Sequence, residues 1–273
     1  MSYRFIVFSN ASNGKGRDMA VVIALCNQKG GVGKTTSTVN IGAALAEQGQ
    51  RVLMVDLDPQ AALTAYWGLQ EPLSEPTLYQ LLSDSRPPVQ SALRSVRPTI
   101  DVIPSDIDLA AAEIELFSAL GRERILKEEL DPLNDAYDYV LIDCPPNLGL
   151  LTINALVSAQ GVIVPLQCEY FALRGLSMLL DTLHKVKRRL NPQLEIIGIL
   201  PTLYNARTRH AKEVLEEVRT MFGERVFDTV VRTSIRFAES TLAHQPILEY
   251  APTHPGAQAY RSLAKEIIHD TTT

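Results

Sequence analysis

The sequence predicts an α/β fold in which a mainly parallel, twisted β-sheet carries helices on both faces. Short apolar runs alternate with segments whose apolar residues recur at helical spacing, which is typical of successive βα units. A glycine-rich segment, residues 29–36, separates the first apolar run from the first helical segment. Aspartates directly follow two later apolar runs. Because parallel strands end at the same edge of a sheet, these features predict a ligand site at that edge.

Seven strands and six helices are expected from these patterns. The expected strands are 20–26, 51–56, 100–104, 138–143, 160–165, 195–201 and about 226–231. The expected helices are 35–48, 106–118, 148–158, 171–190, 208–222 and about 256–269. In the helix 171–190 the apolar side chains follow i, i+3, i+4, i+7 spacing and predict one buried stripe, formed by Leu173, Leu176, Leu179, Leu180, Leu183, Val186 and Leu190. Residues 71–88, dotted with prolines, predict a loop with one short helix.

The composition indicates one large domain, expected to span residues 19–270. The 46% content of hydrophobic residues and the mean hydropathy of +0.02 are typical of a soluble globular protein. Residues 1–18 are expected to form a flexible lead, and residues 271–273 a disordered tail. The apolar runs are too short to span a membrane, and residues 1–18 lack the apolar centre of a signal peptide, so we expect a cytoplasmic location.

The three cysteines, Cys26, Cys144 and Cys168, lie inside or beside expected strands. Buried, reduced thiols are the favoured interpretation. Because no two cysteines have C-x-x-C spacing, a metal or cluster site is disfavoured.

The charge of the chain is unevenly distributed. The net charge is −5, but residues 184–236 hold eleven Lys/Arg and six Asp/Glu, so this segment carries +5 and the rest −10. Such an asymmetry can place a DNA-facing surface on an acidic protein. The alternative is a set of solvated helix faces, which charge alone slightly favours.

The glycine-rich segment reads Lys29-Gly-Gly-Val-Gly-Lys-Thr-Thr36 and lies between an expected strand and an expected helix. In this context backbone N–H groups and a helix N-terminus wrap phosphates. Lys34 would reach the β- and γ-phosphates, and the Thr35 hydroxyl would ligate Mg²⁺. The general pattern G-x-x-x-x-G-K-[ST] has a glycine where this chain has Gln28, beside the additional Lys29. The candidate nucleotide-binding residues are Lys29, Gly30, Gly31, Val32, Gly33, Lys34, Thr35 and Thr36.

This segment resembles the deviant Walker A motif of the ParA/MinD group of P-loop ATPases, whose members carry the extra lysine. Three further blocks extend the resemblance, in order, to ParA/Soj-type partition ATPases: 52–60 (VLMVDLDPQ), 139–146 (YVLIDCPP) and 167–170 (QCEY). It covers about residues 21–268. The resemblance implies a P-loop NTPase fold, ATP and Mg²⁺ as cofactors, and hydrolysis of ATP to ADP and phosphate.

Three aspartates complete the expected site. Asp56, Asp58 and Asp143 follow expected strands, where carboxylates can lie near a triphosphate and its metal ion. The resemblance implies that Asp58 positions and activates the attacking water, that Asp56 supports the metal shell, and that Asp143 is the Walker B residue that holds a Mg²⁺-bound water. An aspartate after a strand can instead simply cap a turn. The coincidence of three with a P-loop favours the functional interpretation.

Lys29 has a separate role in the resembling family, where it crosses a face-to-face dimer to the phosphates bound by the other subunit. Positive charge delivered in this way stabilises a phosphoryl group during transfer. The alternative is an ordinary surface lysine. The resemblance therefore implies catalytic roles for Lys29, Lys34 and Asp58 and an ATP-dependent homodimer, which a bulky residue at Gly30 would block.

Arg207 and Arg236 align with the family's arginines for non-specific binding of double-stranded DNA, although either could form a surface ion pair. Weaker candidates for the same face are Lys185, Lys187, Arg188, Arg209 and Arg232. The chain departs from the family pattern at four places, namely Ala61-Ala62 for Gly-Asn, Asn147 for serine, Arg174 for an acidic residue, and a missing proline in 233–239. None of these changes removes a group needed for phosphate or metal.

The expected function is a DNA-partitioning ATPase, associated with the nucleoid, whose hydrolysis a ParB-type adaptor protein stimulates. A related machine that positions protein cargo, such as chemoreceptor clusters or carboxysomes, would share these residues. A MinD-like division-site ATPase is less favoured, because the last helix lacks the Lys/Arg flanks of a membrane-surface helix, and no membrane partner is expected. Metabolic ligases or synthetases with P-loop folds belong to another class, which Lys29 and the lack of a second substrate constellation disfavour.

Overall fold

The computed structural model describes residues 19–69, 76–84, 86–169 and 172–272. The expected lead, residues 1–18, and residue 273 lie outside the described residues.

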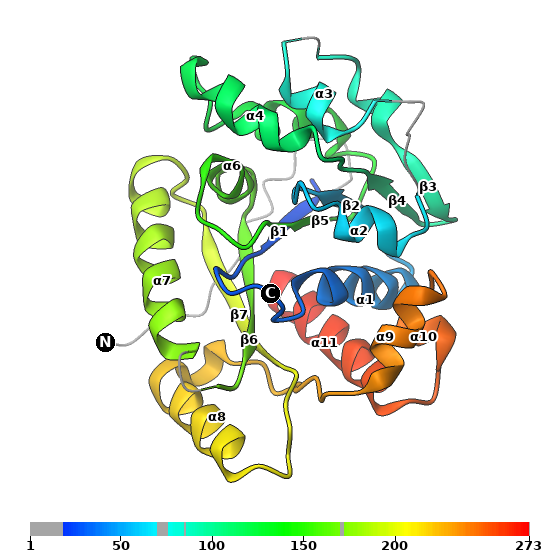
Figure 1. Cartoon of the computed structure of the whole chain (residues 1–273), viewed down its shortest axis with the longest axis vertical. Helices are drawn as coiled ribbons and strands as arrows, with labels where there is room; N and C mark the ends of the chain where they lie inside the picture. The colour runs from blue at the N-terminus through cyan, green and yellow to red at the C-terminus, as the bar shows by residue number, and fades with distance from the viewer. Residues whose placement is uncertain (1–18, 70–75, 85, 170–171, 273) are drawn as a thin grey trace.

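A seven-stranded sheet runs through the centre of the molecule in the order β3-β4-β2-β5-β1-β6-β7 (Figure 1). The strands are β1 (Val21–Leu25), β2 (Val52–Asp56), β3 (Arg94–Arg97), β4 (Ile100–Ile103), β5 (Tyr139–Asp143), β6 (Gly161–Gln167) and β7 (Glu195–Thr202). All neighbours pair in parallel except the edge strand β3, which pairs antiparallel with β4. The prediction of a mainly parallel sheet is confirmed.

The helices are α1 (Lys34–Glu47), α2 (Ala62–Tyr66), α3 (Leu78–Leu82), α4 (Leu109–Glu115), α5 (Ile125–Leu130), α6 (Leu150–Ser158), α7 (Ala172–Arg189), α8 (Arg209–Phe222), α9 (Ile235–Leu242), α10 (Ile247–Tyr250) and α11 (Pro255–Thr272). The six expected helices are present, with α4 ending in a 3₁₀ turn at 116–118. The short α3 lies in the proline-dotted stretch, as expected.

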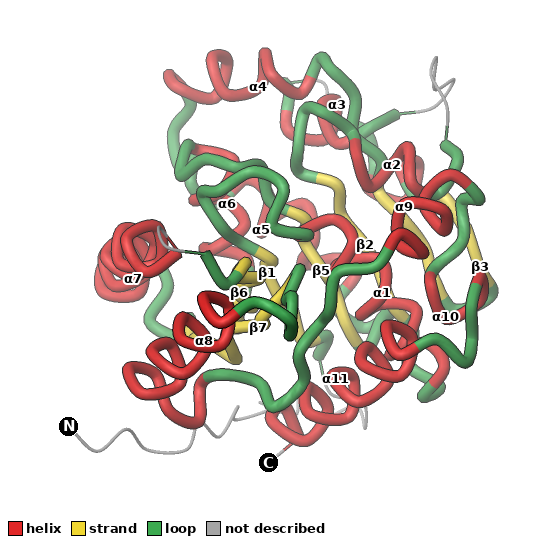
Figure 2. The backbone as a smooth tube through the Cα atoms, turned by 60° about the horizontal axis from the view of Figure 1, so that its bottom comes forward, coloured by secondary structure: helices red, strands yellow, loops and turns green. Residues whose placement is uncertain are grey.

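Two hydrophobic cores cover the two faces of the sheet. Side chains of α1, α2, α10 and α11 pack on one face, and those of α3 to α8 pack on the other. Figure 2 shows this arrangement, with α1 and α11 on one side of the strands and α5 and α6 on the other. In α7, the stripe Leu176, Leu179, Leu183 and Val186 is buried as predicted, and Leu173, Leu180 and Leu190 pack against it. The three cysteines are free and buried, as predicted.

The expected strand at about 226–231 is wrong. Only isolated bridges join this region to β7 and the loop after it, between Val226 and Ile199 and between Arg232 and Tyr204. In the middle of the segment, the backbone N–H groups of Asp228 and Thr229 donate to the carboxylate of Glu266 on α11. Because Glu266 takes the N–H of Thr229, the next donor in register after Phe227, and Val231 instead donates to the carbonyl of Pro201, the segment follows β7 without becoming a strand.

The C-terminal boundary of the domain also differs from the expectation. Helix α11 continues to Thr272, and Thr271, which we expected in a disordered tail, is 1% exposed. Its hydroxyl lies 2.8 Å from the Tyr139 hydroxyl at the start of β5. This buried contact ties the end of the helix to the amino edge of the sheet.

Candidate nucleotide-binding site

The glycine-rich loop connects β1 to α1 at the carboxyl edge of the sheet. Gly31 and Gly33 have φ angles of 71° and 84°, in the left-handed region that side chains disfavour. Gly33 is the N-cap of α1, and its carbonyl accepts the N–H of Ser37 at 2.9 Å. The N-terminus of α1 therefore opens directly onto the loop, as a phosphate site requires.

Two side chains that the sequence analysis did not single out hold the loop in place. Asn27 accepts the N–H of Lys29 (2.9 Å) and donates to the carbonyl of Pro165 on β6 (2.7 Å). Thr202, the last residue of β7, donates to the carbonyl of Val32 (2.7 Å). A polar residue directly after a buried strand was the available signal for Asn27. The contact of Thr202 depends on a strand far along the chain.

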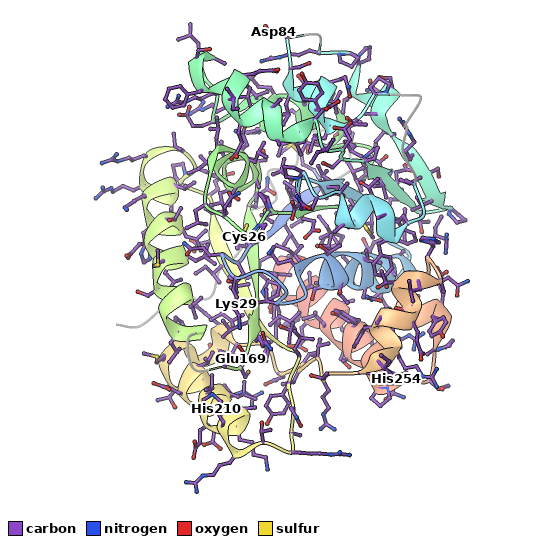
Figure 3. All side chains as sticks on the ribbon, viewed as in Figure 1. Cys26, Lys29, Asp84, Glu169, His210 and His254 are labelled. Atoms are coloured by element: carbon purple, nitrogen blue, oxygen red, sulfur yellow. The ribbon has the colours of Figure 1, made fainter. Side chains whose placement is uncertain are left out.

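The two lysines of the loop lie in opposite environments. Lys34, the first residue of α1, is 7% exposed and lies inside the site near Asp143. The Lys29 side chain is 43% exposed, and its Nζ lies 2.5 Å from Glu169 Oε2 and 3.1 Å from Gln167 Oε1. Figure 3 places Lys29 and Glu169 in neighbouring loops below Cys26. The block that follows β6 thus supplies a counter-ion for Lys29, a role that the sequence analysis missed.

The carboxylates meet behind this loop. Asp56 and Asp143 are the last residues of the adjacent strands β2 and β5 and lie at the same register. Asp143 accepts the hydroxyl of Thr35 (2.6 Å) and that of Thr38 (3.3 Å). Asp56 accepts both the N–H (2.8 Å) and the hydroxyl (2.7 Å) of Thr64 on α2.

Burial raises the pKa of both carboxyls. The pKa of Asp143 rises to about 7, mainly because of burial and then because of the nearby Asp56, while the Thr35 bond and Lys34 oppose the rise. The pKa of Asp56 rises to about 6, again mainly through burial, against the bonds from Thr64. Two buried carboxylates this close are costly to ionise together, and a cation at the site would lower that cost.

The donor set fits a magnesium ion that keeps most of its water. Among the described residues, no three His, Cys, Asp or Glu side chains form a protein-only metal cage. Mg²⁺ usually retains several waters and takes one or two protein oxygens plus substrate phosphates. Thr35 would supply a direct oxygen, and Asp143, which already bonds the Thr35 hydroxyl, would hold a bound water.

Asp58 lies on the loop that leads from β2 to α2 and is partly exposed. Its Oδ1 accepts the N–H of Gln60 (3.0 Å), and its own N–H donates to Asp56 (3.2 Å). Ala61, three residues after Asp58, is the N-cap of α2 and has a φ of 50°. The departure from the family's glycine therefore places an alanine in the left-handed region, at a cost of about 1 kcal/mol.

At two of the other positions where the sequence departs from the family pattern, the side chain forms a local hydrogen bond. Asn147 Oδ1 accepts the N–H of Gly149 (2.8 Å), which closes a turn before α6. In the segment 233–239, which lacks the expected proline, Ser234 caps α9 by accepting the N–H of Arg236 (3.2 Å). The side chain of Arg174 lies outside the described residues.

Arg207 lies in the turn before α8, and Arg236 lies in the first turn of α9; the segments that lead into these two positions run side by side. The N–H of Tyr204 donates to the carbonyl of Val231, and that of Thr233 donates to the carbonyl of Tyr204. Both arginines are exposed, and Arg236 Nη1 lies 2.7 Å from Glu239. The structure thus brings these two predicted residues to one edge, beyond the end of β7.

The weaker basic candidates do not all share that edge. Arg209 and Arg232 lie there, with Arg209 paired to Glu213 at 2.7 Å. Helix α7 runs back along the sheet, and near its end Lys187 pairs with Glu195, the first residue of β7. The end of α7 therefore lies at the opposite end of β7 from Arg207, and it carries Lys185, Lys187 and Arg188. Their assignment to the same face is therefore wrong.

Comparisons with known proteins agree with this geometry. A family described as an AAA domain matches residues 20–196. The sporulation initiation inhibitor protein Soj of Bacillus subtilis is 46% identical over 91% of this chain and 98% of its own length. The chromosome partitioning protein ParA of Caulobacter vibrioides is 44% identical over 90% of this chain and 93% of its own length. The chain belongs to the Soj/ParA family of P-loop ATPases.

The solved structures support the same fold. Cobyrinic acid a,c-diamide synthase from Mycobacterium smegmatis, solved with an ATP analogue and magnesium, is 40% identical and superposes with a TM-score of 0.80 over 92% of this chain and 95% of its own. Among the described residues of this Soj/ParA family member, no helix is both long and apolar enough to cross a membrane.

Replacing Ala61 with glycine should stabilise the protein. Glycine adopts the left-handed conformation without strain, while its greater freedom in the unfolded chain offsets part of the gain, so Ala61→Gly should raise the free energy of unfolding by about 0.5 kcal/mol. Urea denaturation measures this change. Ala65→Gly, inside α2, is the matched control and should destabilise. Destabilisation by both variants would contradict the strained conformation.

Replacing Asp143 with asparagine should change how stability depends on pH. Because the folded pKa of Asp143 lies above its ordinary 3.8, its stabilising contribution is present below pH 4 and is lost as pH rises through 7. In EDTA without nucleotide, the stability of Asp143→Asn relative to wild type should therefore increase by about 2–3 kcal/mol between pH 4.5 and pH 8. Urea denaturation at both pH values measures this. A difference that is independent of pH would contradict the raised pKa.

Proposed function

We propose that this protein is a Mg²⁺-dependent DNA-partitioning ATPase. Its ATP-bound dimer binds DNA non-specifically, and a ParB-type adaptor protein stimulates hydrolysis and release. The observation that carries this proposal is the outward position of Lys29, on the same loop that buries Lys34 in the phosphate site. A lysine that faces away from its own site can serve only a second molecule or a surface ion pair.

The nucleotide site supports hydrolysis by this chain. Lys34 and the loop N–H groups would bind the phosphates, Thr35 and Asp143 would hold the metal ion, Asp143 through a bound water, and Asp58 would orient the attacking water. The M. smegmatis relative was solved with an ATP analogue and with ADP, each with magnesium. We infer the same ligands here. Bound Mg²⁺ supplies charge that neutralises the phosphates during transfer.

Dimer formation would exchange one ionic partner of Lys29 for another. In the single chain Lys29 pairs with Glu169, and both side chains are about half exposed. Such exposed pairs contribute only about 0–1 kcal/mol. A triphosphate on a second subunit offers more negative charge in a site from which water is excluded, so Lys29 would leave Glu169 on dimerisation. ATP thereby becomes part of the interface.

DNA binding fits the edge that carries Arg207 and Arg236. Two subunits double the phosphate contacts of these arginines, so affinity for DNA should depend on ATP and fall with salt. This binding would place the protein on the nucleoid. A machine of the same design that moves protein cargo remains the alternative within this class.

A second candidate comes from one relative. The M. smegmatis protein is named as a synthase of a small molecule, and it shares the fold at 40% identity. A ligase of that kind would turn over ATP only with its small-molecule substrate. ATP turnover stimulated by DNA and an adaptor protein, without such a substrate, separates the two functions.

Gly30→Val should prevent dimerisation without unfolding the chain. A Cβ at Gly30 meets nothing within 4 Å in the single chain, and the residue lacks the positive φ of Gly31, so folding stability should change by less than about 0.5 kcal/mol. Two loops that meet face to face would clash there. Light scattering with a non-hydrolysable ATP analogue and Mg²⁺ should give a dimer for wild type and a monomer for Gly30→Val.

Two controls keep this result interpretable. A fluorescent ATP analogue should bind Gly30→Val with an affinity within about threefold of wild type, because the phosphate contacts remain. Lys29→Ala should also stay monomeric. A wild-type protein that stays monomeric when saturated with nucleotide would contradict the proposed switch.

Arg207→Ala and Arg236→Ala should each weaken ATP-dependent retention on non-specific DNA by about tenfold. Each removes one phosphate contact per subunit and should make the salt dependence less steep. The assay uses Asp58→Ala as background, because loss of the water-orienting carboxylate should keep the ATP-bound dimer. Arg188→Ala, at the other end of the molecule, is the matched control and should retain DNA normally. Retention that does not change with ATP would contradict the function.

A further inference from the structure

Helix α4 carries apolar side chains on two opposite faces. Leu109, Ala112 and Leu116 are buried in the core. On the outer face the chain exposes Ile107 (61%), Ile114 (79%) and Phe117 (73%). Together with the exposed Ala110, these residues are spaced i, i+3, i+7 and i+10. Ala110 and Ile114 lie on α4, Ile107 lies in the turn before it and Phe117 in the 3₁₀ turn after it, so the spacing puts all four on the outer side of this segment. We call Ile107, Ala110, Ile114 and Phe117 the α4 stripe.

The α4 stripe lies at the periphery of the molecule, and its side chains are not part of the hydrophobic core. Figures 1 and 2 both show α4 at the outer edge, beyond α6. Leu120, which follows the stripe, is 99% exposed. Scattered apolar residues need no explanation, but a contiguous exposed line marks an interaction surface.

The charge around the stripe indicates what can cover it. Residues 105–121 contain four carboxylates and no lysine, arginine or histidine, the acidic residues being Asp106, Asp108, Glu113 and Glu115. Asp108 and Glu115 are exposed beside the stripe. At its far end Arg122 stacks on Phe117 at 4.9 Å, and it is already paired with Glu123. The border of the stripe is therefore acidic.

We propose that the α4 stripe is a docking surface for a partner protein that presents apolar side chains bordered by lysine or arginine. The proposal rests on the proposed function and deepens it by giving the chemistry of the adaptor. A second copy of this chain fits less well, because a two-fold contact through the stripe would bring Asp108 and Glu115 of both copies together, and like charges across an interface are unfavourable.

The chain before α4 and the last turn of α4 contact segments that lie next to the site carboxylates. Just before the helix, the N–H of Ser105 donates to the Thr64 hydroxyl (2.9 Å), which itself donates to Asp56 (2.7 Å). Within the helix, Glu113 accepts the N–H of Leu151 (3.4 Å) at the start of α6, directly after the loop that follows Asp143. A partner on the stripe therefore binds a segment that is joined by these hydrogen bonds to the neighbours of Asp56 and to the start of α6.

The test uses two labelled model helices of about 18 residues, long enough to form a helix on binding. Both peptides carry leucine at i, i+3, i+4 and i+7. At the remaining positions, one peptide has lysine and the other has glutamate. Fluorescence anisotropy with the full chain should show the lysine peptide binding at least about tenfold more tightly than the glutamate peptide. Equal binding of the two peptides would overturn the proposal.

Substitutions locate the surface. Ile114→Ser with Phe117→Ser should weaken binding of the lysine peptide by about tenfold or more. The matched control, Met221→Ser with Leu242→Ser, removes two apolar side chains that are 61% and 82% exposed on α8 and α9, and should bind as wild type does. Because all four positions are exposed, both variants should unfold at the wild-type temperature. Equal affinity of the two double variants would overturn the proposal.

Two further measurements distinguish the remaining outcomes. Sedimentation without nucleotide tests whether a second copy of the chain covers the stripe. If wild type self-associates and the double variant Ile114→Ser with Phe117→Ser does not, a second copy is the occupant and the proposal is overturned. The same variant should keep ATP-dependent retention on DNA. If wild type binds the lysine peptide through the stripe but never retains DNA with ATP, the proposed function fails while the docking surface stands.

Discussion

The pairing of Asp56 with Asp143 constrains the rest of this structure. Both carboxylates end adjacent parallel strands at the same register, and both are fully buried behind the glycine-rich loop. Two negative charges in this position need hydrogen bonds and a cation. Thr35, Thr64 and Lys34 supply part of that compensation. The protein therefore keeps a site whose own electrostatics favour a bound metal ion.

The glycine-rich loop places two lysines, five residues apart in sequence, in different environments. Lys34 begins α1 and is buried, so it can act only on a nucleotide bound to its own chain. Lys29 lies on the outer side of the loop, where Glu169 balances its charge. Because this ion pair is exposed and weak, it can hold the side chain without preventing its transfer to a stronger anionic partner. The single chain is thus compatible with a dimer that forms only around nucleotide.

Most of the fold and the phosphate site could be predicted from sequence, because both depend on local patterns. Apolar runs and glycine positions located β1, β2 and β5 and the loop before α1. The errors came from distant contacts. Glu266 takes the N–H of Thr229, which a strand at 226–231 would have needed, and the direction of α7 separates Lys187 from the edge that carries Arg207.

The sequence by itself determined the chemistry of this protein, because the P-loop residues and the aspartates are adjacent in the chain to the strands that position them. Only the tertiary structure decided which side chains complete that chemistry. Thr202 and Glu169 reach the loop through contacts of β7 and of the segment after β6 that no spacing along the chain reveals. The structure alone also shows that one face of α4 stays in solvent, since a helix with apolar residues on two faces gives no sign in sequence of which face the core covers.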